Sequence, residues 1–200
     1  MSRFSSKRRV LLTTTAALVL SAALAGCGKK ELAFQGSDIT GTQLGRDLDM
    51  IDGSGKPRTL DDYKGKVAVV FFGFTQCPDV CPTAMSELSQ TMELLGSDAD
   101  KVQVIMVSVD PARDTPEVLS AYVKAFHPSF VGLTGTEEQL GKTAKSFKAY
   151  YAKSSGGTAE QYSMDHASSF YILDQDGEAR VLVSGNTPAK DIASDIRQLL

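Results

Sequence analysis

Hydrophobic and polar residues follow two different periods along this chain. Residues 66–72 form a near-continuous run of β-branched and aromatic side chains, and residues 102–109 form a second run. Such runs are typical of strands that are buried on both faces. Between them, from Pro82 onward, apolar residues recur at helical spacing as far as Gly96, a residue that often ends helices. The pattern therefore predicts a buried strand, a helix and a second buried strand.

The rest of the chain continues this alternation of strands and helices. The predicted helices cover about 114–126, 136–150 and 188–200, and the predicted strands are 47–51, 58–60, 130–133, 168–173 and 179–183. The Ser- and Gly-rich residues 153–161 are expected to form a loop. We therefore predict an α/β fold in which a central mixed sheet is flanked by helices. The first two short strands, around a Gly-rich turn, add an N-terminal β-hairpin extension.

The first 26 residues differ from the rest and predict an export signal. A basic segment that ends at Arg9 precedes the apolar stretch 10–25, which is too short and too rich in Ala and Thr for a membrane span. The stretch ends in Leu-Ala-Gly-Cys27, which resembles the lipobox of bacterial lipoproteins. An ordinary cleaved signal is the alternative. We expect a lipoprotein signal peptide (1–26), a tether lipidated at Cys27 (27–35) and a single domain (36–200).

The charge of the chain changes when this signal is removed. The signal contains four of the 21 basic residues and none of the 24 acidic ones, so the remainder has a formal net charge of −7. Binding to nucleic acid needs a basic surface, and we therefore expect no nucleic-acid partner. The remainder is also long enough to bury a core without disulfides, so its cysteines are expected to serve chemistry.

Apart from Cys27, Cys77 and Cys81 are the only cysteines of the chain, and both lie where the first buried strand meets its helix. A cysteine pair at this place is a thioredoxin-like arrangement. Because proline disfavours a helical residue before it, we expect Cys81 to be the N-cap and Pro82 the first helical residue. The helix dipole would then lower the pKa of the thiols, which suits a nucleophile or a metal ligand. Thioredoxins have two residues between their cysteines and this loop has three, so both roles stay open.

The chain has two histidines. His127 precedes a proline at a helix end, where it would interact with the helix dipole. His166 comes just before the predicted strand 168–173, close enough to reach both sulfurs, and Asp165 could orient it. Two thiolates and one imidazole suit copper(I) and can also bind copper(II). Zinc usually has a fourth ligand, and this set leaves that position open. A zinc enzyme site is less economical, because no neighbouring general base is evident.

Several segments together resemble the Sco/SenC family of copper chaperones that act in cytochrome c oxidase assembly. They are FGFTQCPDVCP at 72–82, DPARDTP at 110–116, YSMDH at 162–166 and GSDITG at 36–41. The resemblance implies a thioredoxin-like domain in which Cys77, Cys81 and His166 bind one copper ion. It also makes Asp79 and Asp110 candidates for outer-shell roles, with a helix-start residue and a turn residue as the alternatives. Arg113 is expected to anchor its loop.

The resemblance further implies a location and partners. Members of the family are membrane-anchored and face the periplasm or the outside of the cytoplasmic membrane. They are thought to deliver copper to the CuA site of oxidase subunit II, or another copper-site apoprotein, or to keep its cysteines reduced, and an upstream periplasmic donor would supply the copper. The alternative is a thiol-disulfide oxidoreductase, in which Cys77 and Cys81 pair when oxidised. A peroxidase is the weaker alternative, because the loop that contains Cys77 and Cys81 (residues 74–81, called the cysteine loop) has no arginine. Asp165 and His166 stand where thioredoxins have a cis-proline, which favours metal binding.

Overall fold

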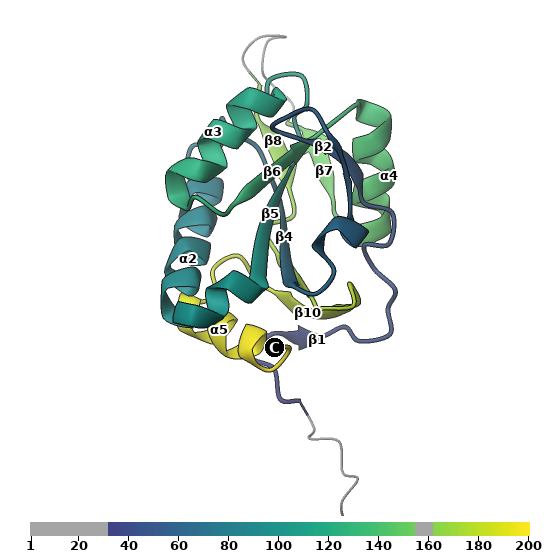
Figure 1. Ribbon diagram of the computed structural model, residues 1–200. Coiled ribbons are helices and arrows are strands. Elements are labelled where there is room, and N and C mark those ends of the chain that lie inside the picture. The colour runs from purple at the N-terminus through teal and green to yellow at the C-terminus, as the bar shows by residue number, and fades with distance from the viewer. Residues whose placement is uncertain (1–31, 155–161) are drawn as a thin grey trace, which may run out of the picture. The chain divides into compact units, whose positions relative to one another are not determined.

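Two fully buried strands form the centre of the domain in the computed structural model, which describes residues 32–154 and 162–200 (Figure 1). Strands β4 (Val67–Gly73) and β5 (Val102–Ser108) are buried at every position and pair in parallel. Their nearly continuous apolar sequence, with Gln103 and Ser108 as polar exceptions in β5, follows from this position, because a strand covered on both faces has no solvent side for polar residues. The two strands predicted from these runs are confirmed.

Six further strands complete one mixed sheet in the described residues, in the order β1-β10-β9-β4-β5-β6-β2-β3. They are β1 (Ser37–Asp38), β2 (Asp49–Asp52), β3 (Pro57–Thr59), β6 (Val131–Thr134), β9 (Phe170–Leu173) and β10 (Ala179–Val183). Strand β6 runs parallel to β5, whereas β9 runs antiparallel to β4. The hairpin β2–β3 joins the edge at β6, as the predicted N-terminal extension. This arrangement is the α/β, thioredoxin-like fold that the sequence predicted.

Helices cover the sheet. They are α2 (Val80–Leu95), α3 (Pro116–Phe126), α4 (Glu137–Phe147) and α5 (Ala189–Arg197), with short 3-10 segments at η1 (Leu60–Tyr63) and η2 (Gly96–Lys101). Helices α2 and α3 lie on one side of the sheet and α4 on the other, while α5 packs against α2 (Figure 1). Three of the helix ends have recognisable caps. The Thr115 and Thr136 side chains each accept a backbone hydrogen bond, and Gly96 ends α2 with a φ of 60°.

Two features differ from the prediction. Helix α4 ends at Phe147, before the expected boundary, because Lys148 takes a left-handed conformation. Beyond it, β7 (Tyr151–Lys153) and β8 (Met164–His166) form a separate antiparallel pair. This pair was not predicted, because three-residue strands are too short to show a period. His166 is therefore part of a strand and not of a loop.

The chain before the sheet is tied to the last helix. Backbone amides of Gln35 and Gly36 donate to the two oxygens of the buried Asp195 carboxylate, at 2.7 and 2.9 Å. Ala33 and Gln198 exchange two more hydrogen bonds. Ala33 and Gln35, which lie in the segment expected to be a tether (27–35), are thus bonded to α5 and the residue that follows it.

Some expectations fall outside the described residues. These are the signal peptide (1–26), the lipidated Cys27 and most of the Ser/Gly-rich loop (155–161). Within residues 32–154 and 162–200, none of the helices has the length and apolar character that crossing a bilayer requires.

Candidate metal centre

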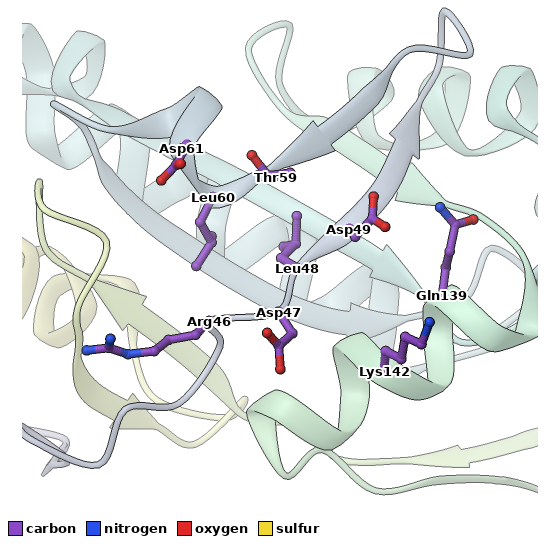
Figure 2. Close-up of a pocket in the computed structure, with 9 residues that line it drawn as sticks. All are labelled: Arg46, Asp47, Leu48, Asp49, Thr59, Leu60, Asp61, Gln139 and Lys142. Carbon is purple, nitrogen blue, oxygen red and sulfur yellow. The ribbon is translucent and has the colours of Figure 1, made fainter.

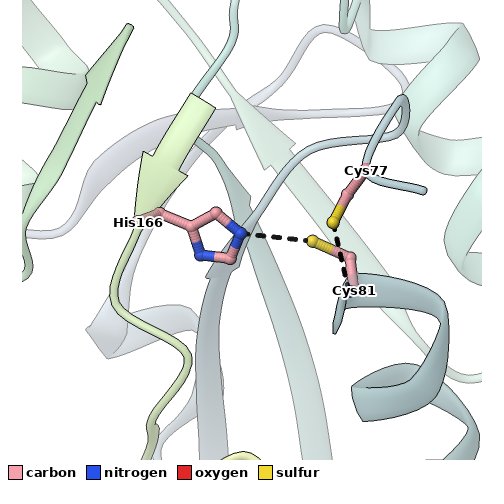
Figure 3. A group of neighbouring side chains, drawn as sticks. All are labelled: Cys77, Cys81 and His166. Atoms are coloured by element: carbon pink, nitrogen blue, oxygen red, sulfur yellow. Dashed lines mark hydrogen bonds between the residues drawn. The ribbon is translucent and has the colours of Figure 1, made fainter. Parts of the chain in front are cut away.

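Three side chains that can bind a metal meet at one edge of the sheet (Figure 3). Cys77 lies in the loop after β4, Cys81 in the first turn of α2, and His166 at the end of β8. Their candidate ligand atoms all lie within 4.8 Å of one another, and His166 Nε2 is 3.4 Å from Cys81 Sγ. Among the described residues, this is the one such group of three or more Cys, His, Asp or Glu side chains. The structure thus brings together the three residues predicted from the sequence.

The start of helix α2 corrects the predicted N-cap. The helix begins at Val80 with Asp79 as N-cap, so Cys81 and Pro82 both lie inside the first turn. A proline fits there, because amides of the first turn have no partner within the helix. The free amide of Cys81 instead points at Cys77 Sγ, at 3.4 Å. The Cys77 sulfur therefore acts as an acceptor at the helix N-terminus.

Burial dominates the chemistry of Cys81. Its side chain is fully buried, and this burial raises the pKa of the thiol well above its ordinary value. The expectation that the helix dipole would lower the pKa is wrong for this residue, because desolvation outweighs it. The space around the sulfur is so small that Gly73 could not carry a side chain. An added Cβ there would lie 3.0 Å from Cys81 Sγ and 2.7 Å from the Phe71 ring. Cys77 is only half-buried.

The imidazole of His166 is oriented by the backbone. Its Nδ1 lies 3.0 Å from the carbonyl oxygen of Ala167. Because a carbonyl can only accept, Nδ1 carries the proton, which leaves the lone pair of Nε2 directed at Cys81. Phe71 and Phe74 hold the ring edge-on, with centroids 6.0 and 5.8 Å away. The tautomer is thus the one that a metal ligand requires at Nε2.

The site opens on one side into a cavity of about 370 Å³, which Cys77, His166 and Met164 help to line. The buried Cys81 is not part of this lining. A larger hollow of about 460 Å³ lies elsewhere, between the hairpin β2–β3 and helix α4 (Figure 2). Its lining contains charged residues such as Arg46 and Lys142 but neither Cys nor His. The chemistry therefore belongs to the smaller cavity.

The three candidate outer-shell carboxylates are not hydrogen-bonded to the ligands. No hydrogen bond among the described residues joins the side chain of Asp79, Asp110 or Asp165 to Cys77, Cys81 or His166. Asp165 accepts from the Ser154 hydroxyl, so the Ala167 carbonyl takes the orienting role expected of Asp165.

The other candidates have structural surroundings. Asp110 is buried and accepts from Arg113 and from the Tyr162 hydroxyl. Arg113 bonds to neighbouring loops, as predicted for an anchor. His127 bonds to Ser129 and lies outside the group of three.

Sequence reasoning missed Asp114, whose side chain holds the cysteine loop through hydrogen bonds to Thr75. Its buried carboxylate accepts from the Thr75 hydroxyl and the Ser108 hydroxyl, both at 2.6 Å, and from the Thr75 amide at 3.1 Å. Burial raises the pKa of this carboxyl above its ordinary value. The sequence suggested only a helix start for this residue, because Thr115 and Pro116 follow it. A full hydrogen-bonding site of this kind depends on tertiary contacts.

The donor set fits a soft metal ion. Two sulfurs and one imidazole nitrogen are the ligands that copper(I) prefers, and they are already close together. A structural zinc site would need a fourth protein ligand, and no further Cys, His, Asp or Glu of the described residues joins the group. The residues therefore favour a low-coordinate soft metal.

Comparisons with known proteins agree with this geometry. The sequence model of the SCO1/SenC family matches residues 37–200. ScoI of Bradyrhizobium japonicum, solved with copper bound, is 36% identical with a TM-score of 0.72, over 78% of this chain and 99% of that one.

Two further solved structures are similar. A SCO1/SenC family lipoprotein of Bacillus anthracis str. Ames is 32% identical with a TM-score of 0.68, over 84% of this chain and 99% of that one. BsSco, described by its disulfide switch and as a member of the Sco family of cytochrome c oxidase assembly proteins, is 25% identical with a TM-score of 0.65, over 84% and 98%.

The two thiols are expected to differ in reactivity. In a Cys27→Ser background, the single-thiol variant that keeps Cys77 (Cys81→Ser) should react with iodoacetamide at least about tenfold faster at pH 8 than the variant that keeps Cys81 (Cys77→Ser). The reason is that burial both raises the pKa of Cys81 and blocks access to it. Mass spectrometry of timed samples measures the rates. Equal rates for the two variants in the folded state at pH 8, and again in urea, would contradict this account.

Proposed function

Because this chain belongs to the SCO1/SenC family, we propose that it binds one copper ion through Cys77, Cys81 and His166 and passes it to another protein. The observation that carries the proposal is the convergence of the three ligand atoms within 4.8 Å, with Nε2 of His166 free to bind. The copper-bound structure of Bradyrhizobium ScoI supports the choice of metal.

The residues of the site have separate parts in such binding. Cys81 is buried and keeps its proton in the absence of a metal, so binding must release that proton. A bound copper ion would supply the positive charge that stabilises two thiolates in this buried place. Cys77 and His166 line the open cavity, and these are the ligands that a partner can reach first. Transfer by ligand exchange therefore begins at their side of the site.

We propose that the recipient is the CuA site of cytochrome c oxidase subunit II or another copper-site apoprotein, and that a periplasmic donor supplies the copper. The description of BsSco as belonging to a family of oxidase assembly proteins supports this partner. The net charge of −7 expected after signal removal is consistent with a protein partner and not with nucleic acid.

Copper titration of the reduced protein tests the proposal. Wild-type protein in the Cys27→Ser background should bind one copper per chain. His166→Ala should weaken binding at least about tenfold, because one of three ligands is lost. His127→Ala is the matched control and should bind like the wild type, since His127 lies outside the site. Competition with a chromophoric copper(I) chelator measures the affinity. Wild-type affinity in His166→Ala would refute the assignment.

The second candidate function is thiol-disulfide exchange, in which Cys77 and Cys81 form a disulfide and reduce the cysteines of the recipient. The two free thiols, one in the loop after β4 and one in the first turn of α2, favour it, as does the disulfide switch described for BsSco. In this step two thiols lose two electrons and two protons to the disulfide of the partner, whose cysteines become thiols.

Complementation in cells separates the two functions. In a strain that lacks this protein, Cys77→Ser should abolish cytochrome c oxidase activity under either function. If copper transfer is the function, His166→Ala should also reduce oxidase activity to the level of Cys77→Ser, because both variants lose a ligand. Oxygen consumption with a reduced cytochrome c donor measures the activity. Full activity of His166→Ala beside an inactive Cys77→Ser would instead establish disulfide exchange.

We also propose that the chain is exported and anchored by lipid on Cys27, facing the periplasm or the outside of the cytoplasmic membrane. The lipobox-like Leu-Ala-Gly-Cys27 and the lipoprotein relative from Bacillus anthracis support this proposal. Growth with an alkyne-labelled fatty acid should label the wild type, and the protein should sediment with membranes. Cys27→Ser should lose the label, whereas Cys77→Ser, the control, should keep it. Labelling of Cys27→Ser would contradict the anchor.

A further inference from the structure

The ligands of the site come from two different sheets. Cys77 and Cys81 follow β4 of the main sheet, whereas His166 belongs to the two-stranded sheet β7–β8. No strand pairing of the described residues joins the two sheets. Apart from the short segment 167–169 that joins β8 to β9, the separation between sulfurs and imidazole therefore depends on side-chain contacts that hold the ribbon β7–β8 against the rest of the domain.

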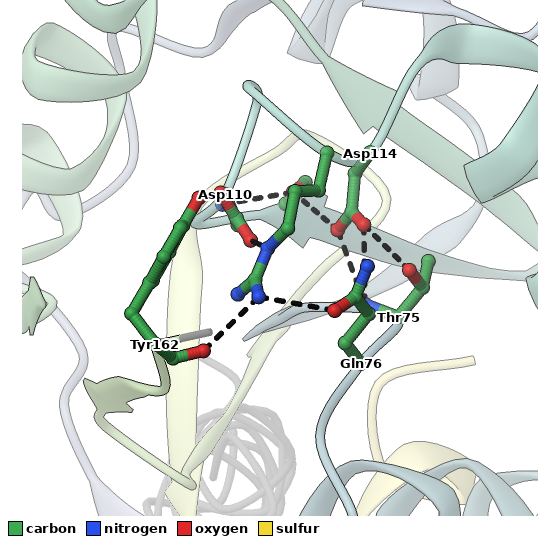
Figure 4. A network of polar contacts seen from close by, with 7 residues as sticks. Thr75, Gln76, Asp110, Asp114 and Tyr162 are labelled. Carbon is green, nitrogen blue, oxygen red and sulfur yellow. Dashed lines mark hydrogen bonds and ion pairs between the residues drawn. The ribbon is translucent and has the colours of Figure 1, made fainter. Parts of the chain in front are cut away.

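Arg113 makes one hydrogen-bonded contact to the cysteine loop and one to the segment that leads into β8. Its Nη1 donates to the side-chain oxygen of Gln76 and to the backbone carbonyl of Tyr162, both at 3.0 Å. Gln76 directly precedes Cys77 in the chain, and Tyr162 lies shortly before β8 (Figure 4). One guanidinium nitrogen thus links the cysteine loop to the ribbon that carries His166.

Arg113 is itself held in place by neighbours. The buried carboxylate of Asp110 pairs with its Nε, and the Tyr162 hydroxyl donates to the other oxygen of the same carboxylate at 2.7 Å. The guanidinium also lies over the Tyr162 ring, 3.7 Å from its centroid. The Arg113 side chain is only 15% exposed and that of Asp110 2%. Such a planar donor, fixed by a carboxylate and a ring, has little freedom to rotate away from its two acceptors.

We propose that Arg113 is a positioning residue that sets the distance between the cysteine loop and His166. It touches none of the three ligands, so it acts through Gln76 on one side and Tyr162 on the other. The consequence for copper rests on the function proposed above, whereas the structural link does not. This role goes beyond anchoring its own loop, because without Arg113 the ribbon is expected to open while the sheet stays intact.

The first arm of the test follows the ribbon without any metal. In the reduced, full-length chain, Arg113→Met keeps the length of the side chain but removes its charge and its hydrogen bonds. Amide hydrogen exchange should become about tenfold faster in the ribbon, for example at Ala167, whose amide donates to the Tyr150 carbonyl. Exchange in β4 and β5 should not change. Unchanged exchange in the ribbon, or an equal increase throughout the domain, would overturn the proposal.

The second arm measures release of copper to an excess chelator. Arg113→Met should release it about 10-fold faster or more, in the range found for residues that orient metal ligands. Gln76→Ala removes only the link to the cysteine loop, so it should speed release while exchange in the ribbon stays normal. Lys153→Met is the matched control. Its cation lies 4.2 Å from the Tyr162 ring centroid but makes no hydrogen bond to the cysteine loop among the described residues, and both readouts should stay within about twofold of the wild type.

The outcomes separate this inference from the proposed function. If the wild type binds no copper, the proposed function fails, and the exchange arm still decides whether Arg113 holds the ribbon. If copper binds but Arg113→Met changes neither release nor exchange, the positioning role fails alone. Should Arg113→Met not fold, Tyr162→Phe replaces it, because this variant loses only the hydroxyl bond to Asp110. It should shift both readouts in the same direction by a smaller factor, and wild-type values would refute the role.

Discussion

The parallel pairing of β4 with β5 is the constraint on which the site depends. Seven residues of each strand are in register, from Val67 opposite Val102 to Gly73 opposite Ser108. Because the strands run in the same direction, the segments that follow them leave the sheet at the same edge. A further hydrogen bond, from the Val109 amide to the Gly73 carbonyl, extends the pairing. The cysteine loop and the loop of Asp110 and Arg113 are therefore neighbours before any side chain is considered.

Burial then decides how the cysteines behave. Cys81 lies in the first turn of α2, and the absence of a side chain at Gly73 leaves space for its sulfur. Desolvation keeps its thiol protonated, whereas Cys77 lies half-exposed at the mouth of the cavity. A helix N-terminus by itself would favour a thiolate, so the raised pKa of Cys81 shows that burial is the larger effect here. The pair is thus asymmetric, with one accessible sulfur and one protected sulfur.

Much of this arrangement could be predicted from the sequence, for physical reasons. The buried strands could be recognised as nearly unbroken apolar runs, and Gly96 marked the end of a helix through its backbone geometry. The ligand residues were also found, since few cysteines and histidines were available. The ribbon β7–β8, the carboxylate site of Asp114 and the raised pKa of Cys81 were missed. Each of these depends on partners far away in the sequence and leaves no local pattern.

The tautomer and orientation of the His166 imidazole do not depend on the redox state of the cysteines. Its Nδ1 proton is engaged by the Ala167 carbonyl, a neighbour in its own chain segment, and the ring is packed between Phe71 and Phe74. A disulfide between the two sulfurs would remove two ligands yet leave the imidazole in the same tautomer and orientation. Reduction would then restore all three donors without a rearrangement of β8. The proposed metal binding and the proposed disulfide would in this way be alternative states of one site, and the redox state of the sulfurs would select between them.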